Sequence, residues 1–571
     1  MFYQPVECGY TTKQRHLKER EIMLMKAKTD VSSDTDIRPE IQTDIKFDNR
    51  FVRELPADPD PENKRRQVLG AAYSRVIPKK TSSPKRVAYS GEVADILGFT
   101  QAFCESDTFL KTFSGNLLLP GMDPYAACYG GHQFGNWAGQ LGDGRAINLG
   151  EIVNKKSGRW VLQLKGAGPT PYSRTADGLA VLRSSIREFL CSEAMFHLRV
   201  PTTRALSLVL TGEKVERDMF YDGRPKLEPG AVVCRVAPTF TRFGNFEIFA
   251  ARGETAILKQ LTDYTLRTDF PHLGDPCPEV YAAWFDEVCK LTADMILHWM
   301  RVGFVHGVMN TDNMSITGLT IDYGPYGWLE DYNPGWTPNT TDAATHRYCF
   351  GNQPAIAHWN LAQLANAIYP LIGKAEPLQA AIDSFGEYYQ NGWQNMMALK
   401  LGFKSFQPET DAPLVKDLLE TLTLTETDMT LFFRNLALLE IEGGRERPDD
   451  VETLIKPLME AFYVPSQITD SYLERLHAWL KTYIRRLEQD NRPVSEKQKQ
   501  MNHVNPRYVL RNYLAQLAID KAEKGDYSMI HELQEVLRHP YENQPGKEAF
   551  AEKRPDWARK KPGCSMLSCS S

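Results

Sequence analysis

The spacing of apolar residues changes along the chain from a strand-like to a helix-like period. Between about residues 88 and 240, short apolar runs alternate with glycine-rich turns. Within the segment 159–165, Trp160, Leu162 and Leu164 fall on one face, and this alternation predicts a strand. The glycines and prolines that follow end that strand.

Longer segments with apolar residues three and four positions apart predict helices. The first is predicted over residues 177–196, and its apolar stripe consists of Leu179, Leu182, Ile186, Phe189 and Leu190. A second helix is predicted over residues 280–300. After about residue 370 the pattern is mainly helical, as in residues 471–487.

Composition and charge narrow the classes of protein to which the chain can belong. Its 571 residues carry 67 Lys and Arg against 72 Asp and Glu, a net charge of −5, and no nucleic-acid motif. No binding to nucleic acid is therefore expected. No run of about 18 apolar residues occurs, so no membrane span is predicted. The ten cysteines lack a C-x-x-C pair, which predicts reduced thiols.

The loop after the second predicted helix resembles the catalytic loop of a protein kinase with one residue changed. Kinase loops read H-R-D-L-x-x-x-N. Here His306 is followed by Asn313 at the position of the Asn, whereas Val308 occupies the position of the catalytic Asp. A valine cannot accept a proton. The domain is therefore either inactive or performs different chemistry with ATP.

A pair of candidate metal ligands follows from the same region. Residues 319–322 predict a short strand that ends at Asp322. Asn313 and Asp322 supply oxygen ligands of the kind that Mg²⁺ takes alongside ATP phosphates, and Asp312 adds a carboxylate beside Asn313. The alternative is an ordinary polar loop with a carboxylate at the end of a strand.

Upstream residues offer candidate phosphate contacts. The glycines Gly142 and Gly144 let backbone N–H groups approach phosphate oxygens, and Arg145 could add a bidentate contact. A glycine-rich hairpin turn accounts for the same residues. In a kinase, a strand Lys pairs with a Glu on the following helix and holds the ATP phosphates. Lys165 and Glu188 fit this pattern. The alternative interpretation is an unrelated Lys at the end of a strand and an exposed Glu on a helix.

Two further arginines, Arg235 and Arg242, lie among apolar residues, where they suit either a polyphosphate clamp or ordinary salt bridges. Asp177 and Gly178 begin the first predicted helix, and a helix N-cap is their local interpretation.

Several sequence blocks together resemble one family, selenoprotein O and its bacterial relatives, the pseudokinase protein adenylyltransferases. The resemblance covers roughly residues 85–370 and extends to the helical region and the Ser-Cys-Ser-Ser end. The blocks are Tyr129-Gly-Gly-His-Gln-Phe-Gly, Gln140-Leu-Gly-Asp-Gly-Arg, Leu164-Lys-Gly-Ala-Gly, Pro171-Tyr-Ser-Arg, Pro201-Thr-Thr-Arg-Ala-Leu, Arg235-Val-Ala-Pro, Arg242-Phe-Gly, 306–315 and 319–325.

The resemblance implies an α+β, protein-kinase-like bilobal fold that binds ATP in a flipped orientation and has a helical C-terminal extension. It implies transfer of AMP to Ser, Thr or Tyr hydroxyls of other proteins with release of pyrophosphate, and in some members UMP transfer with Mn²⁺. By position, Asp312 would accept the proton, Glu188 would pair with Lys165, and Asn313 and Asp322 would bind Mg²⁺ or Mn²⁺. The implied ATP-binding residues are Gly142, Gly144, Arg145, Lys165, Asp177, Gly178, Arg235, Arg242 and Asp322.

Five segments are expected on this basis. They are a flexible tail over residues 1–50, an N-lobe over 51–250, a C-lobe with the catalytic loop over 251–400, a helical extension over 401–555 and a C-terminal tail over 556–571.

A redox switch is implied for some relatives, in which a Cys of the activation segment pairs with a near-terminal Cys. Cys569 matches the second position, but Pro338 occupies the first. Cys349 and Cys564 lie nearby without support from the resemblance.

Two other functions remain open at this point. A small-molecule or protein phosphotransferase would share His306, Gly307 and Asn313, although Val308 argues against it. A binding-only pseudokinase scaffold would also lack the base. A monomer is expected, in the cytoplasm if the source is bacterial, with mitochondria as the eukaryotic alternative.

Overall fold

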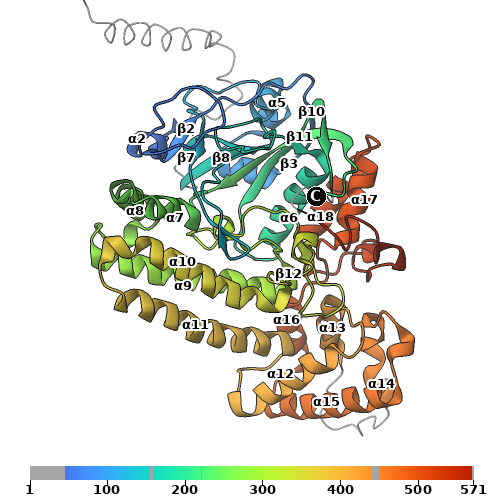
Figure 1. Ribbon diagram of the computed structural model, residues 1–571. Coiled ribbons are helices and arrows are strands. Elements are labelled where there is room, and N and C mark those ends of the chain that lie inside the picture. The colour runs from blue at the N-terminus through green and yellow to red at the C-terminus, as the bar shows by residue number, and fades with distance from the viewer. Residues whose placement is uncertain (1–45, 155–157, 220, 440–450, 569–571) are drawn as a thin grey trace, which may run out of the picture.

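The computed structural model describes residues 46–154, 158–219, 221–439 and 451–568, and places a sheet-bearing lobe above a helical one (Figure 1). Within these residues the main sheet runs in the order β2-β4-β7-β8-β11-β10-β3, with β1 on β7 and β9 on β11, and all of its pairings are antiparallel. The strands are β1 Lys46–Phe47, β2 Tyr73–Arg75, β3 Lys85–Tyr89, β4 Tyr125–Ala127, β7 Ala146–Asn154, β8 Gly158–Lys165, β9 Ala180–Val181, β10 Arg204–Arg217 and β11 Lys226–Ala237. The strand predicted over residues 159–165 is confirmed as β8.

Helix α6, Leu182–His197, packs against β10 and β11 and carries Leu182, Ile186, Phe189 and Leu190 of the first predicted apolar stripe into the core, whereas Leu179 lies before the helix. The prediction that this helix starts at residue 177 was wrong. Ala180 and Val181 pair instead with β11, and Gly178 has a φ of +74°. Sheet pairing therefore takes the residues that local periodicity assigned to the first helical turn.

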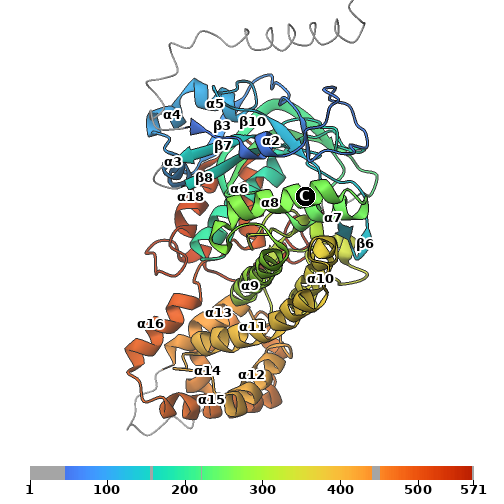
Figure 2. The same ribbon diagram turned by 90° about the vertical axis from the view of Figure 1, so that its left-hand side faces the viewer.

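The short helices of the sheet lobe are α2 Arg50–Glu54, α3 Gly91–Leu97, α4 Gln101–Glu105 and α5 Asp107–Phe113. The helical lobe contains α7 Phe243–Ala251, α8 Thr255–Asp269, α9 Pro278–Val302, α10 Gln353–Ile372 and α11 Glu376–Leu401 (Figure 2). Beyond it lie α12 Pro408–Leu422, α13 Met429–Asn435, α14 Val451–Ile455, α15 Asp470–Gln489 and α16 Val494–Val504. Helices α9 and α15 confirm the helices predicted over residues 280–300 and 471–487.

The chain returns to the sheet lobe at its C-terminal end. Helices α17, Asn512–Ala522, and α18, Ser528–Leu537, pack on α6. One apolar core runs from the sheet through α6, α9 and α10 to these two helices, and a second lies among α12, α13 and α15. The C-terminal region therefore braces the sheet lobe as well as extending the helical one.

A long loop between α9 and α10 carries the kinase-like motif. Its strands β12, Phe304–Val305, and β13, Gly327–Trp328, pair with each other. The strand predicted over residues 319–322 is not formed. Thr320 makes only isolated bridges to Thr202 and Met314, and Asp322 has a φ of +55°, which ends any extended run.

The predicted α+β class, with a sheet lobe followed by helical regions, is confirmed. The division into five segments stays a prediction. Residues 1–45 and Cys569 lie outside the described residues. No helix in the described ranges combines the length and apolar character that crossing a bilayer requires.

A buried ion-pair cluster ties three distant segments together. Arg511 Nη1 lies 2.7 Å from Glu330 Oε2 and 2.7 Å from Asp428 Oδ2. Tyr463 donates a 2.6 Å hydrogen bond to the same Asp428 oxygen. All three charged side chains are buried, so each depends on its partners for the solvation it has lost.

Replacing Arg511 with Met should therefore destabilise the protein by about 3–5 kcal/mol, because it leaves two buried carboxylates without their cation. The half-exposed Arg475, which pairs with Asp417 and Glu420, provides the control. Arg475→Met should cost no more than about 1 kcal/mol. Thermal and urea unfolding of both variants measures the difference, and equal shifts would contradict this account of Arg511.

Candidate active site

A cavity of about 680 Å³ opens between the two lobes. It is bounded by the glycine-rich segment before β7, the end of β8, residues 172–179, the connection after β10 and the loop after α9. The sequence-predicted residues that line it are Gly142, Gly144, Arg145, Lys165, Asp177, Gly178, Asp312, Asn313 and Asp322. Residues from four separate stretches of chain thus meet at one site.

The glycine-rich segment is held against Tyr172. A Cβ on Gly142, which has a φ of +74°, would lie 2.4 Å from Tyr172 Cγ, and one on Gly144 would lie 2.9 Å from the Tyr172 carbonyl oxygen. Between them, buried Asp143 accepts hydrogen bonds from the Ala127 N–H at 3.0 Å and from Asn148 at 3.1 Å. The segment joins β6, Asn136–Trp137, to β7, which are not partners. It is therefore not the turn of a simple hairpin.

Lys165 and Glu188 form an ion pair at the base of the cavity. Their Nζ and Oε2 atoms lie 2.5 Å apart, and both side chains are buried. The other carboxylate oxygen of Glu188 lies 3.3 Å from Arg235 Nη1. Burial lowers the pKa of Lys165, although the charge of Glu188 opposes this effect. β8 and α6 thus bring together two residues that are 23 positions apart (188 − 165).

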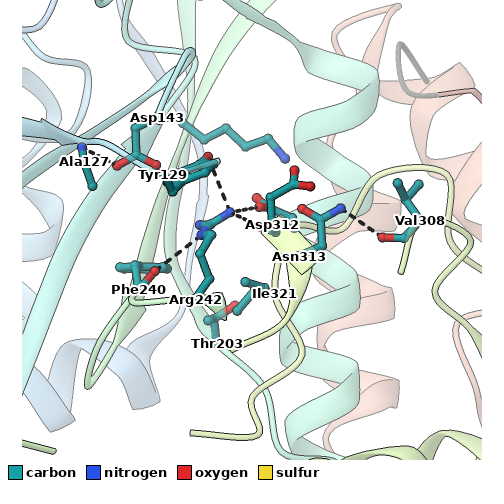
Figure 3. A network of polar contacts seen from close by, with 12 residues as sticks. Ala127, Tyr129, Asp143, Thr203, Phe240, Arg242, Val308, Asp312, Asn313 and Ile321 are labelled. Atoms are coloured by element: carbon teal, nitrogen blue, oxygen red, sulfur yellow. Dashed lines mark hydrogen bonds and ion pairs between the residues drawn. The ribbon is translucent and has the colours of Figure 1, made fainter. Parts of the chain in front are cut away.

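Asp322 is clamped by two buried arginines. Arg242 Nη1 lies 2.5 Å from its Oδ2 atom, and Arg235 Nη1 pairs with its Oδ1 atom. Arg242 also donates to the Asp312 carbonyl oxygen at 2.8 Å and stacks over the ring of Tyr129 at 4.5 Å (Figure 3). Both arginines lie beneath Asp322 and not on the cavity wall.

These arginines keep the Asp322 carboxylate charged. Burial alone would raise the pKa of Asp322, but Arg242, Arg235 and Lys165 outweigh it and hold that pKa well below its usual range. The cavity floor therefore presents a fixed anionic oxygen group at neutral pH.

Asp312 and Asn313 face the cavity from the short 3₁₀ turn Thr311–Asn313. Asn313 donates a 2.9 Å hydrogen bond to the Val308 carbonyl oxygen, which fixes the direction of its amide (Figure 3). Asp312 Oδ2 accepts from Gln133 at 3.2 Å, whereas its buried Oδ1 has no hydrogen-bond partner among the described residues. Val308 itself lines the cavity as an apolar surface.

The environment of Asp312 weakens its acidity. Burial raises the pKa of Asp312 to about 7, against the lowering effects of Arg242 and the Gln133 hydrogen bond. A carboxylate in this range can accept a proton near neutral pH.

Asp177 has a different environment from that expected of a helix N-cap. Arg217 binds it through two contacts of 2.7 and 2.8 Å, and its Oδ1 accepts from the Leu179 N–H at 2.9 Å. Its charge is therefore paired with the end of β10, at the rim of the cavity.

Sequence reasoning missed two groups that the structure places in the cavity. Arg174 lines it with an exposed side chain, and among the described residues neither Arg174 nor Arg145 pairs with a carboxylate. Gln133 reaches Asp312 from the small hairpin formed by β5, His132–Gln133, and β6. The one sequence signal that could have identified Arg174 as a site residue is its position in a polar loop. No local sequence feature distinguishes Gln133 as a site residue.

The chain is similar to known proteins over most of its length. The family model described as "Protein adenylyltransferase SelO" matches residues 62–538. "Protein nucleotidyltransferase YdiU" of Rhodopirellula baltica is 61% identical over 538 residues, covering 92% of this chain and 99% of that protein. The protein of the same name from Aromatoleum aromaticum is 61% identical over 529 residues, with 92% and 99% covered.

Among solved structures, ROP2 from Toxoplasma gondii is described as having a protein-kinase fold and no enzymatic activity. It covers 52% of this chain and 86% of its own, at 12% identity and a TM-score of 0.23. A similarity this distant carries no inference about the chain.

The close contact at Gly142 can be tested against Gly139, three residues earlier. Both have a left-handed φ, +74° and +72°, but a Cβ on Gly139 would meet nothing within 4 Å. Gly139→Ala should cost about 1–2 kcal/mol of backbone strain. Gly142→Ala should add about 1–3 kcal/mol because it displaces Tyr172, and should also weaken binding of a fluorescent ATP analogue. Thermal unfolding and titration measure both effects, and matching behaviour of the two variants would refute the Tyr172 contact.

Proposed function

We propose that this chain, which belongs to the SelO family of protein adenylyltransferases, uses the cavity around Asp312 to transfer AMP from ATP to a hydroxyl group of another protein. The chain is a protein nucleotidyltransferase, so its reaction uses a nucleotide and a protein acceptor. The observation that carries the finer assignment is the position of Asp312. Asp312 and the apolar Val308 both line the cavity, and the buried Oδ1 atom of Asp312 has no hydrogen-bond partner among the described residues.

The phosphate-binding side of the cavity would consist of the glycine-rich segment and its unpaired cations. Gly142 and Gly144 leave their backbone accessible to phosphate oxygens. Arg145 and Arg174 can neutralise a polyphosphate without breaking an existing ion pair. Lys165 would add a third positive charge while Glu188 holds it in place.

Direct contact of Arg235 and Arg242 with phosphate stays a prediction, because both guanidinium groups bind Asp322 in the structure. The support for a role of these two arginines in the reaction is their electrostatic effect on Asp322. They keep Asp322 ionised and fix its orientation without a cost of reorganisation during the reaction.

The donor set around Asp322 fits Mg²⁺ or Mn²⁺. Asp322 is charged, and the Asn313 amide is oriented by its bond to Val308, so both offer hard oxygen atoms to the same cavity. Asn313 and Asp322 would hold the ion. A divalent cation bound there would neutralise negative charge on the reacting phosphate.

The proposed transfer forms one bond and breaks another. The acceptor hydroxyl oxygen attacks the α-phosphorus, its proton passes to the Asp312 carboxylate, and the bond from the α-phosphorus to the bridging oxygen of the β-phosphate breaks. Pyrophosphate carries away the negative charge, which Arg145 and Arg174 would stabilise from the cavity lining. Ser, Thr and Tyr are the protein residues whose hydroxyl groups fit this chemistry. UMP transfer from UTP with Mn²⁺ would follow the same steps.

Phosphate transfer of the kinase type is less well supported. It would need a proton acceptor at position 308, where the apolar Val308 lines the cavity. A scaffold without activity would need neither an unpaired Asp312 oxygen nor unpaired cations around the cavity.

ATP labelled in the α-phosphate should transfer its label to protein in the presence of Mg²⁺ or Mn²⁺, and ATP labelled in the γ-phosphate should not, because the proposed reaction releases the outer phosphates. Autoradiography of the chain incubated with candidate acceptor proteins measures both. Label transferred from the γ-phosphate alone would establish a kinase and exclude adenylyl transfer.

Asp312→Asn should lower the rate of AMP transfer by about 10²-fold or more while leaving ATP affinity within a few-fold, because it removes the proton acceptor and keeps the shape of the side chain. Asp331→Asn, at a distant ion pair with Arg554, serves as the matched control and should retain the wild-type rate. A rate near wild type in Asp312→Asn would assign proton transfer to another group.

A further inference from the structure

A second cavity, of about 620 Å³, lies between α9 and α11 and is separate in its lining from the cavity around Asp312. On α9 it is lined by Asp294, Leu297, His298 and Arg301, which recur at helical spacing on one face. On α11 it is lined by residues at corresponding positions, from Tyr388 to Leu399. Two facing helices therefore form a groove with its own set of side chains, which adenylyl transfer does not use.

The middle of this groove is apolar. Leu297, Met396 and Leu399 line it, and Leu399 is 42% exposed although it is a large apolar residue. Gly392 lets Leu297 pack closely against α11, because a Cβ at that position would lie 2.3 Å from the Cδ1 atom of Leu297. The walls thus suit an apolar group of modest size.

One end of the groove is cationic. Arg301 is buried and donates to the Val504 carbonyl oxygen at 3.1 Å and to the Tyr541 hydroxyl at 2.6 Å. It also donates to the Leu198 carbonyl oxygen and to His298 Nδ1. Since Leu198 and Val504 stand at the ends of α6 and α16, Arg301 has a structural role that neutralises helix C-termini.

Arg199 has no comparable role. Its side chain is bound to the Nε2 atom of His503 and lies over the Tyr541 ring at 5.2 Å, both of which are neutral partners when His503 is unprotonated. Among the residues that the structure describes, no Asp or Glu forms an ion pair with Arg199 or Arg301. Arg199 is exposed and lines the groove without a carboxylate partner among the described residues.

The remaining charges around the groove do not offset this end. Asp294, the one carboxylate in the described lining, is seven residues from Arg301, about 10 Å along the helix, and is bound to the Tyr388 hydroxyl at 3.0 Å. Burial and then Arg301 lower the pKa of His298 to about 4. Burial, Arg199, Arg301 and Lys499 lower that of His503. The groove therefore carries an excess of positive potential at one end.

We propose that this groove binds a small organic anion with an apolar body. The carboxylate or phosphate group would lie against Arg199 at the cationic end, and the apolar part would cover Leu297, Met396 and Leu399. A guanidinium without a carboxylate partner, beside an apolar wall, is the arrangement that such a molecule complements in both charge and polarity.

Decanoate serves as the probe, and its binding to the full chain can be followed by displacement of the fluorescent sulfonate ANS with saturating ATP present to occupy the other cavity. Decanoate should displace ANS, whereas decylammonium and inorganic phosphate at the same concentrations should not. Equal displacement of ANS by decylammonium would show that the negative charge does not contribute to binding. Equal displacement by phosphate would show that contact with the apolar wall does not contribute to binding. Either result would overturn the proposal.

Two variants locate the site. Arg199→Gln should weaken decanoate binding about tenfold, the loss expected for one charged hydrogen-bond donor. Asn395→Trp, at an exposed lining position, should abolish it by filling the groove. Arg267→Gln, an exposed arginine on α8 paired with Glu54, is the control and should bind as wild type does. Unchanged affinity in both Arg199→Gln and Asn395→Trp would place the anion elsewhere and refute this site.

Discussion

The buried ion pairs of Asp322 are the interaction on which the rest of the site depends. Arg235 comes from β11, Arg242 immediately precedes α7, and Asp322 lies in the loop between α9 and α10, so one carboxylate joins both lobes. Both guanidinium groups are buried and depend on Asp322 for their charge partner, so a displacement of either lobe would leave a buried charge unpaired at a cost of about 3–5 kcal/mol. The same clamp orders the neighbouring turn, since Arg242 also binds the carbonyl of Asp312.

This constraint explains how a kinase-like loop can lose its usual base and keep an organised site. Val308 is apolar, yet its carbonyl oxygen positions the Asn313 amide. The carboxylate proposed to accept a proton is that of Asp312, where burial raises the pKa to about 7 and Oδ1 has no hydrogen-bond partner among the described residues. The family to which the chain belongs, and its activity as a protein nucleotidyltransferase, agree with a change of chemistry in this loop and not with its decay.

Helix α9 connects the two cavities that are proposed to bind ligands. Its C-terminal end leads through Gly303, at a φ of +76°, into the catalytic loop, while one of its faces lines the second groove. Arg301 holds the ends of α6 and α16 close to this helix, and α6 carries Glu188. Helices α6 and α9 therefore connect the groove to the cavity around Asp312, although the two linings are separate.

By itself the sequence determined the strand β8, the long helices α9 and α15, and the alignment that brings Lys165, Glu188, Asn313 and Asp322 into consideration. These features follow from local periodicity and from motif spacing, which a short stretch of chain contains in full. Only the tertiary structure decided that Ala180 and Val181 pair with β11 before α6 begins, that residues 319–322 form no strand, and that Arg235 and Arg242 lie beneath Asp322. It also decided that Gln133 meets Asp312 across 179 residues of chain. Such contacts depend on how distant segments pack together. The partner of a buried charge or of a backbone hydrogen-bonding group is set by the tertiary fold and not by the residues next to that group in the sequence.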